Sequence, residues 1–222
     1  PLEAARMNPV LRLLALKIQE IFNEYPPSVR GETGDFRRPG LSPVLIVGAP
    51  RTGSTLLYQL MVKHLEVSFI SNLMAFLPRY MLHIARYTRH WMSRIPDIRM
   101  ANAGYVPGLF RPSEAGAVMK KWFEGCDPES WPLVRKTVGE LSAILNAPFL
   151  NKNTLNSLRL GNIQAVFPDA RFIRMSRNPV LAAQSIVLAR RRSSGSHADW
   201  LGPKPAGYQQ VLQLDPLYQA MW

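Results

Sequence analysis

The sequence predicts an α/β protein with a three-layer parallel sheet, and three observations carry that prediction. The first is an apolar, β-branched run over 43–48, which ends in a glycine-punctuated turn and leads into a helical pattern. The second is a pair of later strand-like runs, 148–151 and 170–175, each followed by helical spacing. The third is the order itself, because strands that alternate with helices favour a parallel sheet covered by helices.

Apolar spacing and turn residues divide the first half of the chain. Apolar residues at helical spacing predict a helix over 2–24, interrupted at Pro9, and a linker rich in Pro, Gly and charge follows over 25–42. After the first strand we expect, in order, a helix over 53–65, a short strand Val67–Ser71, helical structure over 73–93 and an irregular segment over 95–112.

The second half continues the alternation. Ser113 is a suitable N-cap for a helix that runs to Phe123. The remaining expected elements are helices over 129–147, 155–166 and 179–191, a mobile loop over Arg190–Ser196 and a helical pattern over 208–222.

The composition is that of a globular protein with a strongly basic balance. Hydrophobic residues make up 47% and charged residues 19%, and the formal net charge is +12. This charge favours anionic partners such as nucleic acid, anionic lipid or a highly phosphorylated small molecule. The single cysteine, Cys126, excludes an internal disulfide, and no run of 18 apolar residues predicts a membrane-spanning helix.

The turn after the first strand is the most informative motif. Gly48 and Gly53 have the spacing of the P-loop pattern G-x-x-x-x-G-K-[ST], but Ser54 occupies the position of the lysine. A strand, a glycine-containing loop and a helix N-terminus together suit an anion. Since nucleotide triphosphatases use that lysine on the β- and γ-phosphates, the loop suits a nucleotide phosphate and not ATP hydrolysis. The fold is therefore expected to have P-loop NTPase-like topology with a helical insert.

Further cationic residues follow the other two expected strands. Lys152 follows one, and Arg177 follows the other, with Ser185 two helical turns further on. Because ligands of parallel sheets bind beyond the carboxyl ends of the strands, all three motifs are expected at one edge. Taken alone, Arg177 also suits a structural ion pair, with Ser185 facing solvent.

These motifs resemble those of the sulfotransferases that use 3′-phosphoadenosine 5′-phosphosulfate (PAPS). Pro50–Thr55 matches their loop P-[KR]-[ST]-G-[ST]-[ST] at every position, and the pair Arg177 and Ser185 matches their 3′-phosphate motif. The segment Asn151–Asn153 resembles the strand-end lysine segment of the bacterial and tyrosylprotein branches. The resemblance covers about residues 43–190.

The resemblance implies a role for each matched residue. Arg51 would contact the leaving phosphate and the sulfonate, and Lys152 would be the second cation near the bridging oxygen. Pro50, Thr52, Gly53, Ser54 and Thr55 would complete the 5′-phosphosulfate loop, and Arg177 and Ser185 would hold the 3′-phosphate. The reaction implied is an in-line displacement by a hydroxyl or amine that leaves adenosine 3′,5′-bisphosphate (PAP), with side chains in place of a metal.

The general base is the least determined residue. The histidine that cytosolic relatives carry two residues after the strand-end lysine is replaced by Thr154. Glu114 is the best remaining candidate, although a glutamate in the first turn of a helix is also favoured by the helix dipole. His83 and His90 suit the solvent or the core edge better, and no His/Cys/Asp cluster has metal-ligand spacing.

We expect a single domain over 1–222. Its expected parts are an N-terminal helix and linker (1–42), a nucleotide-binding core (43–72 and 148–192) and a helical, acceptor-binding insert (73–147), with a C-terminus that is incomplete. The nine aromatic side chains of the insert suit either an acceptor lid or core packing.

The expected acceptor is a small-molecule, lipid, carbohydrate or carrier-bound hydroxyl. The run Arg190–Arg192 suits an anionic acceptor or a solvated helix end, and the oligomeric state is not predicted.

Three alternatives remain open from the sequence. A kinase-like P-loop protein shares the fold, a non-catalytic relative would bind the nucleotide alone, and the +12 charge would suit a nucleic-acid-binding module. Nucleic acid is not the expected partner, because no recognition motif is present and the basic residues are scattered. We expect a cytoplasmic location, or the Golgi lumen if an N-terminal anchor has been removed.

Overall fold

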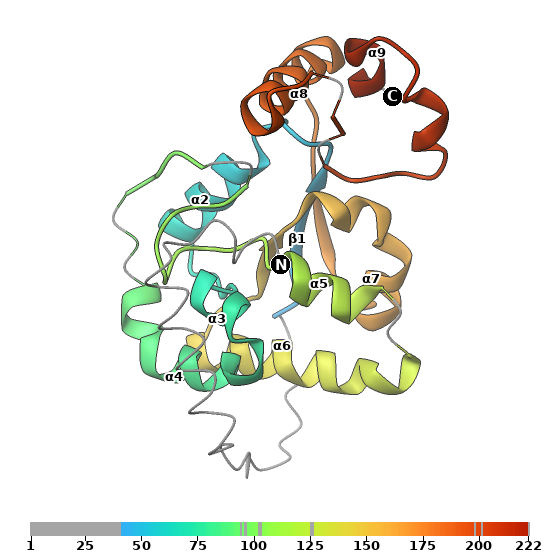
Figure 1. Ribbon diagram of the computed structural model, residues 1–222. Coiled ribbons are helices and arrows are strands. Elements are labelled where there is room, and N and C mark those ends of the chain that lie inside the picture. The colour runs from blue at the N-terminus through green and yellow to red at the C-terminus, as the bar shows by residue number, and fades with distance from the viewer. Residues whose placement is uncertain are drawn as a thin grey trace.

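Three parallel strands lie at the centre of the protein, and they confirm the predicted α/β class (Figure 1). The computed structural model describes residues 41–221 except 94, 96, 102–103, 125–126, 198 and 201, so the predicted helix over 2–24 lies outside the described residues. The strands are β1 (Val44–Gly48), β2 (Leu150–Lys152) and β3 (Arg171–Met175), in the order β2-β1-β3. Leu45 of β1 pairs with Asn151 on one side and Phe172 on the other.

Helices surround this sheet, with α2 and α7 to either side of the strands in Figure 1. The α-helices are α2 (Ser54–His64), α3 (Asn72–Phe76), α4 (Met81–Met92), α5 (Gly116–Phe123), α6 (Trp131–Leu145), α7 (Leu160–Val166), α8 (Pro179–Ser194) and α9 (Pro216–Met221). Short 3₁₀ helices are η2 (Pro78–Tyr80), η3 (Pro128–Ser130), η4 (Thr154–Leu158) and η5 (Tyr208–Val211). Among the described residues, none of these helices has the length and apolar character needed to cross a membrane.

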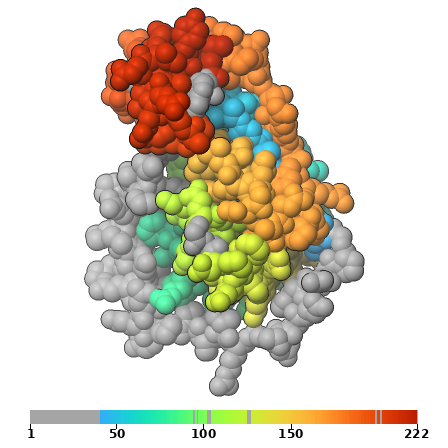
Figure 2. Space-filling view, turned by 90° about the vertical axis from the view of Figure 1, so that its right-hand side faces the viewer, coloured from blue at the N-terminus to red at the C-terminus, as the bar shows by residue number. Residues whose placement is uncertain are grey.

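The hydrophobic core lies between the sheet and the helices α2 to α7. Its most buried members include Ile46 of β1, Leu150 of β2, Met119 of α5, Leu141 of α6 and Ile163 of α7. Burial of such side chains contributes roughly 1.5–3 kcal/mol each. Helix α8 instead packs against α9 at the end of the molecule towards which the strands run (Figure 1). The C-terminal residues form a lobe at that end in the space-filling view (Figure 2).

Two predicted elements of the first half are wrong in detail. The segment Val67–Ser71 is not a strand, because it makes only isolated bridges, from Ser68 to Phe149 and from Ser71 to Pro112. Ser71 instead caps α3, where its hydroxyl accepts a hydrogen bond from the amide of Met74. The helical stretch predicted over 73–93 is divided at Pro78, which lacks an N–H and starts a new 3₁₀ turn.

Three predicted boundaries in the second half are also wrong. Helix α5 starts at Gly116 and not at a Ser113 cap, because Ala115 has a left-handed φ of 48°. The helix predicted over 155–166 is divided into η4 and α7. The expected mobile loop Arg190–Ser196 is largely helical, since α8 continues to Ser194 and ends at Gly195 with a φ of 79°.

Candidate functional site

The loop after β1 contains two residues with a left-handed backbone. Arg51 and Gly53 both have positive φ, 66° and 88°, and the carbonyl of Gly53 accepts the first helical hydrogen bond of α2 from Leu57 at 3.1 Å. A left-handed arginine costs about 1–2 kcal/mol, so the surrounding structure must hold it there. Consecutive amides in such a turn form an anion-binding concavity.

Side chains on both sides fix this loop. The hydroxyl of Thr52 donates to the carbonyl of Ala49 at 2.9 Å, which keeps Thr52 buried and outside the lining of the cleft. The amide of Gly48 donates to the hydroxyl of Ser157 in η4 at 2.9 Å. Gly202, from the C-terminal segment, packs against the ring of Pro50. The loop is therefore held by one internal hydrogen bond and by contacts from two other segments, η4 and the C-terminal segment.

Arg177 and Ser185 both reach Arg51. The Nη1 of Arg177, just after β3, donates to the carbonyl of Arg51 at 3.1 Å. The Nε of Arg51 donates to the Oγ of Ser185 in α8 at 2.9 Å. Asn178 caps α8 by accepting from the amide of Val180 at 3.0 Å, and Pro179 occupies the first helical turn. The two motifs predicted from the sequence thus meet at one residue of the loop.

Lys152 and Glu114 form an ion pair beside the start of α2. Lys152 ends β2 and is 3% exposed. Its Nζ contacts a carboxylate oxygen of Glu114 and also donates to the Oγ1 of Thr55 at 3.1 Å. The lysine beside the loop therefore comes from the neighbouring strand and not from the loop position that Ser54 occupies.

The segment around Glu114 is held by polar side chains that the sequence analysis missed. Glu114 precedes α5 and does not lie in its first turn. The side-chain amide of Asn153 donates to the carbonyl of Glu114 at 3.1 Å, and Gly104 leaves room for the carboxylate, because a Cβ there would lie 2.0 Å from it. Asn151 and Asn153, on both sides of Lys152, could have indicated that another segment packs against the end of β2, because buried side-chain amides need hydrogen-bond partners.

Tyr58 of α2 is a second residue that the sequence analysis missed. It is 1% exposed, and its hydroxyl is 3.4 Å from the carbonyls of both Ser113 and Leu150. Burial, with a smaller contribution from the charge of Glu114, raises the pKa of Tyr58 far above its ordinary value. Tyr58 therefore joins α2 to the segment that carries Glu114 as a neutral phenol.

The irregular segment before Gly104 is tied down by charge pairs. Asp97 pairs with Arg111 and Arg99, and the hydrogen bonds from Arg111 and then Arg99 hold the pKa of Asp97 below its usual value. The side-chain amide of Gln59 in α2 donates to the carbonyl of Arg99 at 3.0 Å and its oxygen accepts from the Arg99 amide at 2.9 Å. These contacts place Met100 beside the loop.

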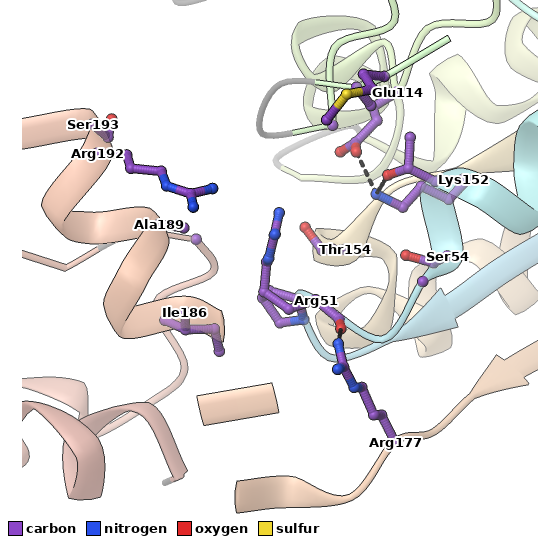
Figure 3. A pocket seen from close by; sticks show the side chains of 17 residues that line it. Arg51, Ser54, Glu114, Lys152, Thr154, Arg177, Ile186, Ala189, Arg192 and Ser193 are labelled. Carbon is purple, nitrogen blue, oxygen red and sulfur yellow. Dashed lines mark hydrogen bonds and ion pairs between the residues drawn. The ribbon is translucent and has the colours of Figure 1, made fainter. Parts of the chain in front are cut away.

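A cleft of about 790 Å³ joins these groups (Figure 3). Of the ten predicted site residues, the eight that line it are Pro50, Arg51, Gly53, Ser54, Thr55, Glu114, Lys152 and Arg177. Thr52 and Ser185 are not part of this lining: Thr52 bonds within the loop, and Ser185 accepts the hydrogen bond from Arg51. Among the residues that the structure describes, the lining carries four cationic side chains and one carboxylate, so it attracts anions. None of the nine aromatic residues of the insert lines the cleft. The described residues through which the insert lines it are Met100, Ala101, Gly104 and Glu114.

The comparison with protein families decides the identity of the chain. A model described as "Sulfotransferase family" matches residues 43–221, which is most of the sequence. The chain belongs to the sulfotransferase family. The predicted membership of the sulfotransferase family is therefore confirmed. The described residues contain no group of three or more side chains that could hold a metal ion.

Two solved structures of sulfotransferases are similar to this family member. Sulfotransferase STF1 from Mycobacterium tuberculosis H37Rv is 17% identical, with a TM-score of 0.43 over 84% of this chain and 56% of that one. Sulfotransferase STF9 from Mycobacterium avium is 13% identical, with a TM-score of 0.40 over 85% of this chain and 58% of that one. This chain thus spans just over half of each mycobacterial chain. No curated protein matched it.

Proposed function

We propose that this protein transfers a sulfuryl group from PAPS to a hydroxyl, or less readily an amine, of an acceptor by in-line displacement. One observation carries the proposal: Arg177 donates to the carbonyl of Arg51, whose side chain donates to Ser185. The residues proposed for the 3′-phosphate therefore adjoin those proposed for the 5′-phosphosulfate. One adenosine with a phosphate at its 3′ position and a phosphosulfate at its 5′ position matches that arrangement.

The donor set fits such a molecule. Residues 50–55 offer amides, hydroxyls and the Arg51 guanidinium, which suit the 5′ end. Arg177 supplies a planar guanidinium and Ser185 a hydroxyl for the 3′-phosphate, the group that separates PAPS from other adenylates. Lys152 reaches Thr55 from the next strand and adds a cation at the loop.

The donor supplies a sulfuryl group on a phosphate leaving group, and the protein supplies charge and a base. Arg51 and Lys152 stabilise the negative charge that develops on the bridging oxygen. Glu114 takes the proton of the acceptor hydroxyl while the acceptor oxygen bonds to sulfur and the bond from sulfur to the bridging oxygen breaks, its electron pair staying on the phosphate. The acceptor is a small-molecule, lipid, carbohydrate or carrier-bound hydroxyl.

Glu114→Gln tests the base. With labelled PAPS and a panel of hydroxyl acceptors, we expect turnover to fall by about 10²–10⁴-fold while PAP affinity is kept, because the amide cannot take a proton. Glu124→Gln is the matched control, since Glu124 also pairs with a buried cation, here Arg159, but does not line the cleft. Wild-type turnover in correctly folded Glu114→Gln would remove Glu114 from this role.

A further inference from the structure

The three consecutive arginines near the end of α8 have three different environments. Arg190 is 1% exposed, donates to the side-chain oxygen of Gln219 at 3.0 Å and lies over the ring of Trp200. Arg191 is exposed and does not line the cleft. Arg192 lines the cleft, and its side chain points into it in Figure 3. Only the last of the three therefore has a position from which to bind a ligand there.

The register of α8 separates Arg192 from the residues proposed for the donor. The cleft-lining residues of this helix, Ile186, Ala189, Arg192 and Ser193, recur on one face. Ser185 begins the same face, and seven residues of helix span about 10 Å. In Figure 3 the Arg192 side chain extends into the cleft at the end opposite Arg177, so an anion at Arg192 is a different group from the one proposed at Arg177.

The position of Arg192 corresponds to the acceptor end of the cleft. In Figure 3 Arg192 and Glu114 lie on opposite walls, and Arg177 lies at the other end. Among the described residues, Arg192 has no hydrogen-bond or ion-pair partner, and the one carboxylate of the lining, Glu114, is paired with Lys152. Between the loop and Arg192 the helix presents the apolar side chains of Ile186 and Ala189.

We propose that the acceptor is itself an anion: its carboxylate or phosphate monoester binds Arg192, and a spacer separates that group from the hydroxyl that meets Glu114. This inference rests on the proposed function, and it narrows the acceptor class. The spacer would have to cross the cleft, because Arg192 and Glu114 lie on opposite walls of it in Figure 3. Arg192 acts here as a specificity-determining residue and takes no part in the displacement.

The test measures binding to the protein saturated with PAP by titration calorimetry. The probes are ω-hydroxyalkanoates of graded chain length, each paired with its uncharged primary amide, and the matching ω-hydroxyalkyl phosphates, which show which anion is preferred. We expect the anion to bind at least about tenfold tighter than the amide at the best length, as a charged hydrogen bond typically gives. Arg192→Gln abolishes that preference, Arg192→Lys keeps part of it, and the neighbouring control Arg191→Gln keeps all of it.

Two results would overturn the inference. One is equal binding of every anion and its amide to the wild-type protein. The other is that Arg192→Gln weakens PAP binding and leaves the anion preference intact, which would make Arg192 a donor residue. Failure of wild-type protein to bind PAP at all would instead contradict the proposed function, and the same probe pairs titrated without nucleotide would then test Arg192 on its own.

Discussion

Gly48 is the residue on which the shape of the loop depends most directly. It ends β1 with a φ of 143°, and a Cβ there would lie 2.4 Å from the carbonyl oxygen of Met175 in β3. Neither the backbone angle nor the contact tolerates a side chain. The glycine is therefore needed for the close approach of two strands, and the sequence alone showed only the glycine spacing.

Gly48→Ala is expected to lower the free energy of unfolding by about 2–4 kcal/mol, from the left-handed strain and the clash with backbone. Urea denaturation measures this change. Gly161→Ala in α7 is the control, because no atom lies within 4 Å of the added Cβ and alanine favours the helix. A Gly48→Ala variant as stable as Gly161→Ala would contradict the account of this turn.

Tyr58 predicts an alkaline limit to stability. Its pKa is raised in the folded state by burial and by Glu114, so the folded protein keeps a proton that the unfolded chain loses above about pH 10. The contribution of the Tyr58 phenol to the free energy of unfolding is therefore fully present below about pH 10 and decreases as the pH rises further. Tyr58→Phe should lower the free energy of unfolding by about 0.5–1.5 kcal/mol at pH 8. Between pH 9.5 and 11 the free energy of unfolding of this variant should fall less than that of the wild-type protein. If the free energy of unfolding fell equally with pH in both proteins over this range, the raised pKa of Tyr58 would be contradicted.

At the scale of elements, the strands were predictable and the helix limits less so. β1 and β3 lie within a residue of the predicted runs, because continuous β-branched and apolar stretches bounded by turns have few alternatives. The segment Val67–Ser71 also carries β-branched and aromatic residues, but its last residue, Ser71, caps α3. Helix α8 passes the expected end because arginine favours helices and Gly195 is the first residue that stops it.

The contact between α8 and the C-terminal segment depends on Arg190. Burial lowers its pKa, so the guanidinium relies on Gln219 and the ring of Trp200 for compensation. Arg190→Ala should therefore release α9 locally and raise hydrogen exchange of its amides by at least about tenfold, with little change in the sheet. Arg191→Ala, one position along and exposed, should leave exchange unchanged. Unaltered exchange in Arg190→Ala would show that other contacts hold α9.

At the scale of the whole molecule, topology made most of the site predictable. The loop after β1, Lys152 and Arg177 meet because the carboxyl ends of parallel strands share an edge. The pairing of Glu114 with Lys152 was not predictable, since it depends on a long insert that contacts of Asn153 and Tyr58 bring back to the sheet. The aromatic side chains of that insert were no guide to the cleft, because aromatic content does not separate core from pocket.

The central claim is that the loop and Arg177 hold the two ends of one nucleotide, and a binding cycle tests it most directly. The affinities of PAP and adenosine 5′-phosphate are measured for wild-type protein, Arg177→Ala and the control Arg174→Ala, an exposed residue of β3. Loss of the Arg177 bonds should weaken PAP binding by about 1.5–3 kcal/mol, or 10- to 150-fold, and weaken binding of adenosine 5′-phosphate much less, through the lost bond to the Arg51 carbonyl alone. Arg174→Ala should preserve the preference for PAP. Equal wild-type affinity for the two nucleotides, or an unchanged preference in Arg177→Ala, would contradict the claim.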